Sequence, residues 1–321
     1  MTKFKRKFNM DAIEEVVDAP ENAWFRDLLS HWRPAGDRDG RCESQVEADH
    51  LRLTVRNGYL NFYRAGQSVA KVSIIEGTRR LQATIHKKYV FGENAPGRDY
   101  ILVSEGGFAK PDGSRVRYCE EFLLDWTRAA SQKKYAKEEK QFVDRLVTEN
   151  PGVIDLEAGL PWDPDIWTKK SARRIDVVAL DTLGDRYKLV FWEAKLVTNS
   201  EARSKTAPKV IEQLKRYQRW LAKYQNDVRE AYQTTCAVLA RMHAIARARN
   251  LNACELGSAV GVVARQDPSQ LGLDERPRLI IDDTEENACF MENGHLDKLR
   301  EVGIAVQLVR GATGMSLSAT A

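Results

Sequence analysis

The first half of the chain alternates apolar and polar positions over residues 50–91, and this period of two predicts β-strands. Asn57-Gly58 interrupts the alternation, and this dipeptide between alternating segments is the strongest short-range signal for a β-hairpin. We therefore expect a four-stranded antiparallel meander over about residues 50–91. Residues 11–33 show the spacing of one or two short helices, and the Gly and Pro residues of 92–113 predict a polar loop.

Two apolar strands are predicted within residues 173–196, and they carry charged side chains among Val, Ile, Leu, Phe and Trp. Gly184-Asp185 between them predicts a tight turn, because Gly adopts the positive φ that such a turn needs. With these two residues as the loop, Asp176 faces Glu193 across the hairpin. Side chains alternate along a strand, so Lys195 projects from the same face as Glu193. Two carboxylates and one ammonium group are therefore expected on one face of a mostly buried sheet.

Helices are predicted on both sides of this hairpin. Residues 135–150 carry an apolar stripe that includes the position of Glu139, and residues 210–224 place Gln213 and Tyr217 on one helical face. Each polar residue alone has an ordinary explanation, such as an ion pair at a strand end or a boundary Glu that reaches solvent. However, an unpaired charge in a buried strand costs several kcal/mol, so ionised residues persist there mainly when they pair or bind metal.

The remaining pattern predicts elements that would extend the same sheet. These are helices over 227–250 and 295–302 and strands over 258–265, 278–282 and 303–309. The small polar residues of 311–321 predict a frayed tail.

Four short motifs follow one another along the chain: Glu139, Asp176, Glu193-Ala194-Lys195 and Gln213-x-x-x-Tyr217. Their order resembles the PD-(D/E)XK nuclease superfamily, nearest to RecB-type nuclease domains and related repair and phage-defence endonucleases. The likeness covers roughly residues 131–224, with the departure that Asp176 follows Ile and not Pro. It implies an α/β, restriction-endonuclease-like fold, with a mixed-sheet core flanked by helices over residues 126–310. It does not reach residues 1–125, which are expected to form a small β-rich N-terminal module for target or partner recognition.

The resemblance also implies a set of catalytic residues: Glu139, Asp176, Glu193, Lys195, Gln213 and Tyr217. Asp176, Glu193 and the backbone carbonyl of Ala194 would hold Mg²⁺, with Glu139 as an extra ligand and Mn²⁺ able to substitute. Lys195 would orient or help to deprotonate the attacking water. The remaining two residues would position the substrate and brace the metal carboxylates.

Basic residues gather in the same part of the chain. Residues 169–224 contain 14 Lys and Arg against 6 Asp and Glu, a local net charge of +8, whereas the whole chain carries +4. Such a patch fits phosphate contact, although a solvated helix face would also explain part of it. The predicted nucleic-acid contacts are Lys169, Lys170, Arg173, Arg174, Lys209, Lys215, Arg216 and Arg219.

The predicted N-terminal sheet also interleaves basic and aromatic residues. This combination suits a nucleic-acid surface, where cations meet phosphates and rings stack on bases. Equally, the aromatic rings would fill a small core while the charges keep its surface soluble. The residues concerned are Arg52, Arg56, Arg64, Lys71, Arg79, Arg80, Lys87 and Lys88 with Tyr59, Phe62, Tyr63 and Tyr89.

Several classes of protein do not fit the chain. The five Cys residues are scattered without a CxxC pair, which argues against a disulfide framework or a zinc site. No apolar segment approaches the length of a membrane span, and a cytoplasmic protein is expected. We predict a Mg²⁺-dependent deoxyribonuclease acting on DNA in repair or in defence against foreign DNA. The alternatives are a catalytically inactive nucleic-acid-binding protein on the same fold, or an RNase. Neither a homodimer nor a partner ATPase or helicase can be read from the sequence, and both stay open.

Overall fold

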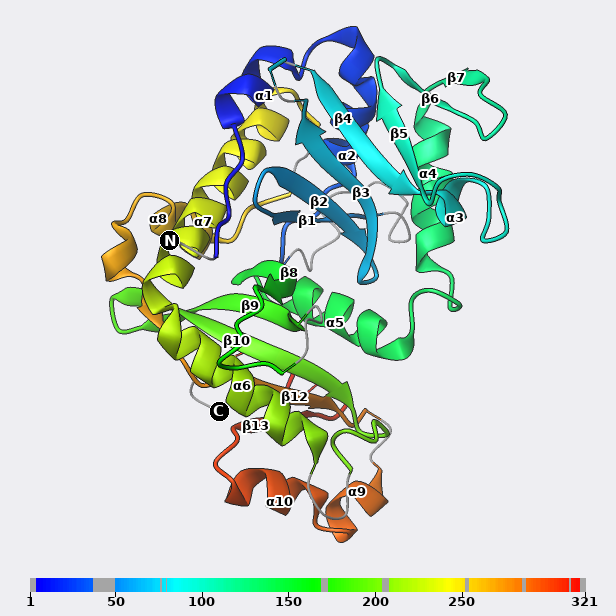
Figure 1. Cartoon of the computed structure of the whole chain (residues 1–321). Coiled ribbons are helices and arrows are strands. Elements are labelled where there is room, and N and C mark those ends of the chain that lie inside the picture. Colours follow the sequence, from blue (N-terminus) through cyan, green and yellow to red (C-terminus); the bar gives the residue numbers. More distant parts are fainter. Residues whose placement is uncertain are drawn as a thin grey trace.

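The computed structural model describes residues 4–36, 50–75, 77, 78, 80–168, 173–203, 208–251, 254–284, 287–311 and 313–317. These residues form a mixed α/β structure with one antiparallel sheet, one mixed sheet and several helices. Figure 1 shows the antiparallel sheet above the mixed sheet, with the long helix α7 (Gln225–Ala248) running beside both. None of the helices in the described residues is both long and apolar enough to cross a membrane.

The antiparallel sheet has seven strands that pair in sequence order. They are β1 (Arg52–Val55), β2 (Tyr59–Arg64), β3 (Gln67–Ile74), β4 (Leu81–His86), β5 (Tyr100–Ser104), β6 (Gly107–Ala109) and β7 (Arg115–Arg117). The first four confirm the predicted meander. The prediction of a loop over 92–113 was wrong, because β5 and β6 lie within it and Gly106 and Gly113, both at positive φ, belong to the turns between strands. Burial of Ile101, Val103 and Phe108 stabilises these short strands.

Short helices pack around this sheet. Two of them confirm the helical spacing of residues 11–33, and the buried residues Trp24, Phe25 and Leu28 form the apolar face of the second. Leu123 and Trp126 are among the buried residues of a longer helix, and the Trp126 ring lies 5.4 Å from that of Phe108. The helices are α1 (Met10–Val16), the 3₁₀ helix η1 (Pro20–Asn22), α2 (Ala23–Ser30), α3 (Lys87–Val90) and α4 (Glu120–Ser131).

The mixed sheet has the strand order β13-β12-β10-β9-β8, and a short strand β11 also pairs with β10. Its strands are β8 (Val153–Leu160), β9 (Arg173–Leu183), β10 (Arg186–Leu196), β11 (Gly272–Leu273), β12 (Arg278–Asp282) and β13 (Val306–Val309). Strands β8, β9 and β10 are antiparallel, whereas β11 and β12 run parallel to β10, and β13 runs parallel to β12. The predicted hairpin register is confirmed, since Val177 pairs with Trp192 and Gly184 has φ +61°.

Helices cover both faces of the mixed sheet. Phe142 of α5 (Glu138–Glu149) and Trp192 belong to the apolar cluster on one face. On the other face, Leu214 of α6 (Lys209–Lys223) and Phe191 belong to a second cluster. Because side chains alternate along β10, Glu193 projects from the same face as Phe191. The motif residues of β10 are therefore held beside α6.

The remaining elements confirm most predictions and correct two. The elements predicted over 227–250, 278–282, 295–302 and 303–309 correspond to α7, β12, α10 (His295–Glu301) and β13. Helices α9 (Ala288–Glu292) and η2 (Pro268–Gln270) were not predicted. The strand predicted over 258–265 was wrong: α8 (Ser258–Val263) lies there, because Val260 and Val263, three residues apart, are buried next to α7. Strand β8 was missed, since its acidic positions hide the apolar pattern.

The end of the described chain is not frayed. Asn150 accepts a hydrogen bond from the backbone nitrogen of Leu317 at 2.7 Å and donates one to the carbonyl of Met315 at 2.8 Å. Leu317 is buried in the apolar cluster of α5. The prediction of a frayed tail was therefore wrong for residues 313–317, because Leu317 is buried and the side chains of Asn150 and Gln307 bond to the backbone of this segment.

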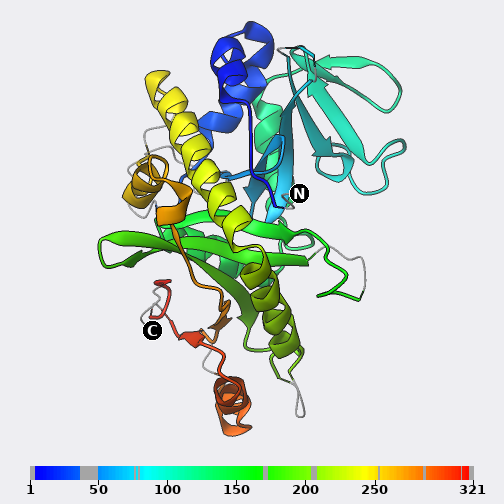
Figure 2. The ribbon, with the colours of Figure 1, turned by 60° about the vertical axis from the view of Figure 1, so that its left-hand side comes forward.

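The two sheets share one core. A continuous apolar cluster extends from Phe62 in the antiparallel sheet to Phe191 in the mixed sheet, with residues of α7 between them. Figure 2 shows α7 running past the mixed sheet to the helices of the N-terminal region. This cluster contains residues from both sides of residue 125. The domain boundary at that residue stays a prediction.

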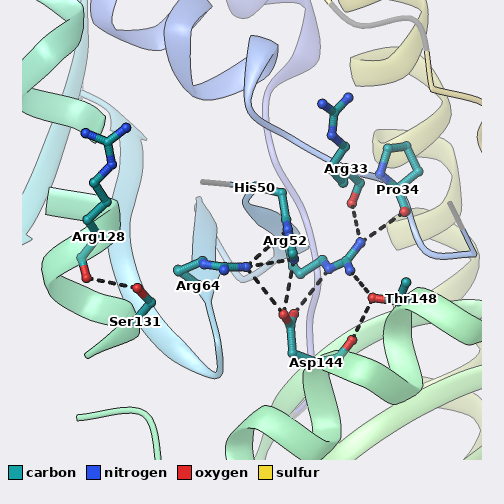
Figure 3. A network of polar contacts seen from close by, with 9 residues as sticks. All are labelled: Arg33, Pro34, His50, Arg52, Arg64, Arg128, Ser131, Asp144 and Thr148. Atoms are coloured by element: carbon teal, nitrogen blue, oxygen red, sulfur yellow. Dashed lines mark hydrogen bonds and ion pairs between the residues drawn. The ribbon is translucent and has the colours of Figure 1, made fainter. Parts of the chain in front are cut away.

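Two buried ionic clusters join the N-terminal region to α5 and to β8. In the Asp144 cluster, Asp144 of α5 contacts His50 at 3.1 Å, Arg52 at 3.3 Å and Arg64 at 3.5 Å (Figure 3). Arg52 also donates to Thr148 at 2.7 Å. These arginines point inward, so their predicted role on a nucleic-acid surface was wrong.

In the Asp155 cluster, Asp155 of β8 accepts hydrogen bonds from Arg6 at 3.1 Å, from Tyr232 of α7 at 3.0 Å and from Arg56. Asp155 is only 1% exposed, so this carboxylate depends on its partners. Phe62, Tyr63 and Tyr89 are buried as well, which favours the alternative that the aromatic residues fill the core.

Candidate active site

The β9–β10 hairpin brings two carboxylates together. The backbone nitrogen of Ala194 donates to Asp176 Oδ2 at 2.8 Å, which holds the Asp176 side chain over β10. Glu193 is 2% exposed and Lys195 is 5% exposed, on the same face of the strand. The predicted convergence of Asp176, Glu193 and Lys195 is therefore present.

The two oxygen atoms of Glu193 have different surroundings. Oε1 accepts hydrogen bonds from Lys195 Nζ and from Gln213 Nε2, both at 2.7 Å. Oε2 is buried and has no hydrogen-bond partner among the described residues. A buried charged oxygen without a donor is costly, so this atom is suited to a cation or a proton.

Burial governs the protonation of this cluster. It raises the pKa of Glu193 to about 7, although Lys195 and Gln213 oppose the shift. It also raises the pKa of Asp176 well above the usual value, and the neighbouring Glu193 charge adds to this effect. For Lys195, burial acts to lower the pKa, but the charges of Glu193, Asp176 and Glu139 outweigh it and raise the pKa. The ammonium group therefore stays charged at neutral pH, whereas the two carboxylates are poised to exchange protons.

Helix α6 supports Glu193 through a chain of hydrogen bonds. Gln213 Nε2, which contacts Glu193, also lies 2.8 Å from Tyr217 Oη. Tyr217 in turn donates to the backbone carbonyl of Arg174 on β9 at 2.8 Å. Burial, together with the Glu193 charge, raises the pKa of Tyr217, so its hydroxyl keeps its proton. The predicted bracing role of Gln213 and Tyr217 thus has a geometric basis.

Glu139 reaches the cluster from the first turn of α5. Its Oε1 lies 3.8 Å from Lys195 Nζ, and its Oε2 accepts a hydrogen bond from Asn199 Nδ2 at 2.9 Å. Glu201 Oε2 lies 3.9 Å from the same ammonium group, and the Glu201 backbone nitrogen donates to Asn199 Oδ1. Asn199 and Glu201 were not predicted from the sequence; their only signal was a polar segment directly after a strand that ends in the Glu-x-Lys motif.

Glu157 of β8 is a further acidic residue that the sequence analysis missed. It has φ +49°, a conformation that is uncommon for residues other than Gly. Lys140 and Arg174 each contact its carboxylate at 3.3 Å. Its charge also contributes to raising the pKa of Asp176, after burial and Glu193. No signal in the sequence pointed to it, because β8 itself was not predicted.

The predicted nucleic-acid contacts that the structure describes differ in their surroundings. Lys169 and Lys170 are outside the described residues. Arg173, Lys209 and Arg216 line a pocket of about 460 Å³ with Gln213 and Tyr217.

The other predicted contacts lie elsewhere. Arg174 pairs with Glu157, as described above. Lys215 lines a different pocket, together with Arg276 and Ala305. Arg219 is exposed and lines neither of these two pockets. Of the six predicted contacts that the structure describes, three thus share a pocket with Gln213 and Tyr217.

The donor set agrees with a hard divalent cation that keeps several waters. Mg²⁺ is usually bound through one or two carboxylates, and the available oxygens here are those of Asp176 and Glu193. Among the described residues, no group of three or more His, Cys, Asp and Glu side chains is arranged to hold a metal ion. Asp176, Glu193, the Ala194 carbonyl and Glu139 stay predictions as metal ligands.

Comparison with known proteins gives no identification, because no family model, no curated protein and no solved structure matches the chain.

Proposed function

We propose that the chain is a Mg²⁺-dependent deoxyribonuclease that hydrolyses DNA phosphodiester bonds. The observation that carries this proposal is the buried Glu193 carboxylate, with one oxygen held by Lys195 and Gln213 and the other without a donor among the described residues, beside Asp176. A restriction-endonuclease-like core is proposed with it. A mixed sheet with helices on both faces, carrying the motifs on β9, β10 and α6, supports that fold.

Each residue has a defined part in the proposed reaction. Mg²⁺, when bound, would supply an activated water and positive charge opposite the developing phosphorane. Asp176 and Glu193 would hold the cation, and Gln213 fixes one Glu193 oxygen so that the other faces the site. Tyr217 ties Gln213 to the backbone of β9.

Lys195 acts as a charged group. The three neighbouring carboxylates raise its pKa, so it does not accept a proton at neutral pH. Its role is to orient the attacking water and to stabilise negative charge in the transition state. Of the two roles that the resemblance implied, the pKa favours this one.

Two alternatives differ in what the site would do. An inactive nucleic-acid-binding protein would need no metal ligands, and the raised pKa values of both carboxylates speak for a functional site. An RNase would use the same residues, because metal-dependent hydrolysis does not by itself distinguish the sugars.

The test is a cleavage assay with purified protein on linear, circular and single-stranded DNA and on RNA, with Mg²⁺, Mn²⁺ or EDTA. We expect DNA to be cut in Mg²⁺ and Mn²⁺ but not in EDTA. Glu193→Gln should abolish cutting, whereas Glu230→Gln, on the exposed side of α7, should leave it unchanged. Cutting of RNA alone would favour the RNase, and binding without cutting by the wild-type protein would favour the inactive protein.

A further inference from the structure

We propose that one nucleic-acid strand crosses the site between two cationic pockets and that Lys133 and Lys137, which the sequence analysis did not assign, contact its backbone. This inference rests on the proposed function and deepens it. The α6 pocket is the pocket of about 460 Å³ that contains Arg173, Lys209 and Arg216. The α5 pocket has a volume of about 630 Å³ and contains Lys133, Lys137 and Lys140.

Both pockets share walls with the candidate active site. Glu139 and Asn199 line the α5 pocket, and Glu201 and Gln213 line the α6 pocket. Lys195 Nζ lies 3.8 Å from Glu139 and 3.9 Å from Glu201. The ammonium group therefore lies between the pockets. The segment from Asn199 to Glu201, closed by its own hydrogen bond of 2.9 Å, separates them.

The cations of these pockets differ from the arginines of the interior. Arg52, Arg56 and Arg64 all form ion pairs with Asp144 or Asp155. By contrast, Lys133 and Lys137 of the α5 pocket and all three cations of the α6 pocket form no ion pair with any residue that the structure describes. Lys140, the third lysine of the α5 pocket, pairs with Glu157. Arg173 Nε is in addition buried without a hydrogen-bond partner among those residues. A cation that is not neutralised by its own protein keeps its full attraction for phosphate.

Size and charge agree with a nucleotide backbone. Volumes of about 460 and 630 Å³ lie within the usual range for ligand pockets. Each pocket carries three Lys or Arg against two Glu, so each is net positive. In each pocket one of these acids, Glu201 or Glu139, is also within 4 Å of Lys195. Apolar walls next to the cations, from Trp167 and Pro208 in one pocket and Leu196 in the other, are suited to the sugars.

The experiment measures binding of labelled oligonucleotides in EDTA at two salt concentrations. The two pocket variants are Lys133→Gln/Lys137→Gln and Arg173→Gln/Arg216→Gln. The matched control is Lys5→Gln/Lys110→Gln, at two exposed positions far from both pockets in the sequence. Single-stranded DNA, double-stranded DNA and RNA serve as separate probes, because all three carry the phosphodiester backbone that the pockets would recognise.

We expect each pocket variant to weaken binding about tenfold or more and to reduce the slope of log affinity against log salt by about 1.4–1.8, for two lost phosphate contacts. The control should match the wild-type protein. If Lys133→Gln/Lys137→Gln binds with the affinity and salt slope of the wild-type protein, the two-pocket path is wrong. The proposed function still stands in that case if the wild-type protein cuts DNA and Glu193→Gln does not. If the wild-type protein neither binds nor cuts any probe, the proposed function itself is wrong.

Discussion

Two kinds of buried carboxylate occur in this protein, and their surroundings differ. In the Asp155 cluster both oxygens are used, since Arg6 and Tyr232 contact one oxygen and Arg56 and the Leu156 backbone nitrogen contact the other. Glu193 is equally buried, but all of its described hydrogen bonds reach one oxygen. A fully matched buried charge serves to join elements of the fold, whereas an incompletely matched one is suited to a ligand.

Asp144, the other carboxylate with several cationic partners, differs from Glu193 in the direction of its pKa shift. Burial acts to raise the pKa of Asp144, but the hydrogen bond with His50 and the charges of Arg52 and Arg64 outweigh it and lower the pKa. For Glu193, burial prevails and the pKa rises to about 7. Asp144 is therefore ionised at all ordinary pH values, while Glu193 changes charge near neutrality.

The largest expected effect concerns catalysis. Asp176→Asn or Glu193→Gln should reduce the rate of DNA cleavage in Mg²⁺ by more than about 10³-fold, because each change removes a charge that would hold the cation. Stability should be unchanged or improved, since a poorly matched buried charge is removed. Single-turnover kinetics and thermal unfolding measure the two effects. Wild-type cleavage rates in both variants would show that the site is assigned wrongly.

The Asp155 cluster should respond in the opposite way. Asp155→Ala leaves Arg6 and Arg56 buried without their carboxylate, which should reduce the free energy of unfolding by about 3–5 kcal/mol. Chemical denaturation of this variant and of Glu193→Gln gives the comparison directly. Asp11→Ala, which breaks an exposed pair with Arg241, is the control and should cost at most about 1 kcal/mol. Equal losses from Asp155→Ala and Glu193→Gln would remove the distinction between the two clusters.

The raised pKa of Glu193 predicts a pH dependence of stability. The folded protein binds this proton more tightly than the unfolded chain, so protonation stabilises the fold. The contribution is fully present below the ordinary value of 4.5 and is lost as the pH rises through about 7, by about 3 kcal/mol in total. Glu193→Gln should therefore have a larger free energy of unfolding than the wild-type protein at pH 8. The difference between the two should become smaller as the pH is lowered. Asp144 acts in the opposite sense, because its lowered pKa gives stability that is lost only in acid.

The affinity for Mg²⁺ should depend on pH, because Glu193 loses its proton near neutrality. Glu193 must lose its proton to bind a cation, so its deprotonation should raise the apparent affinity for Mg²⁺ by up to about tenfold per pH unit below about 7. The raised pKa of Asp176 makes the rise steeper. Calorimetry at several pH values measures the affinity and the protons released. An affinity independent of pH between 5 and 8 would contradict the protonation of Glu193.

The smallest effects are expected from the residues that position the carboxylates. Gln213→Ala and Glu139→Ala should each lower the cleavage rate about 10–100-fold while DNA affinity changes little. Gln213→Glu is a sharper variant, because it keeps the size but removes the amide that donates to Glu193. A loss of affinity as large as the loss of rate would instead place these residues in substrate binding.

The sequence by itself determined the local part of this picture. The period of two along β9 and β10, with Gly184 in the turn, fixes the register up to the pair Val177–Trp192, directly before Asp176 and Glu193. The helical period of α6 places Gln213 and Tyr217 on one face, and these two residues are indeed in contact. Such features depend on residues close in the chain, so a periodic pattern is enough to predict them.

Only the tertiary structure decided which charged side chains have an ion-pair or hydrogen-bond partner. Arg52 and Arg56 alternate with apolar residues as surface positions would, yet their carboxylate partners lie 92 and 99 residues further along the chain. Glu157 and Asn199 likewise gain their roles from partners on other elements. The sequence pattern records the period of an element but not the element that packs against it. Whether a charged side chain is neutralised, buried or free for a ligand therefore depends on contacts that form only on folding.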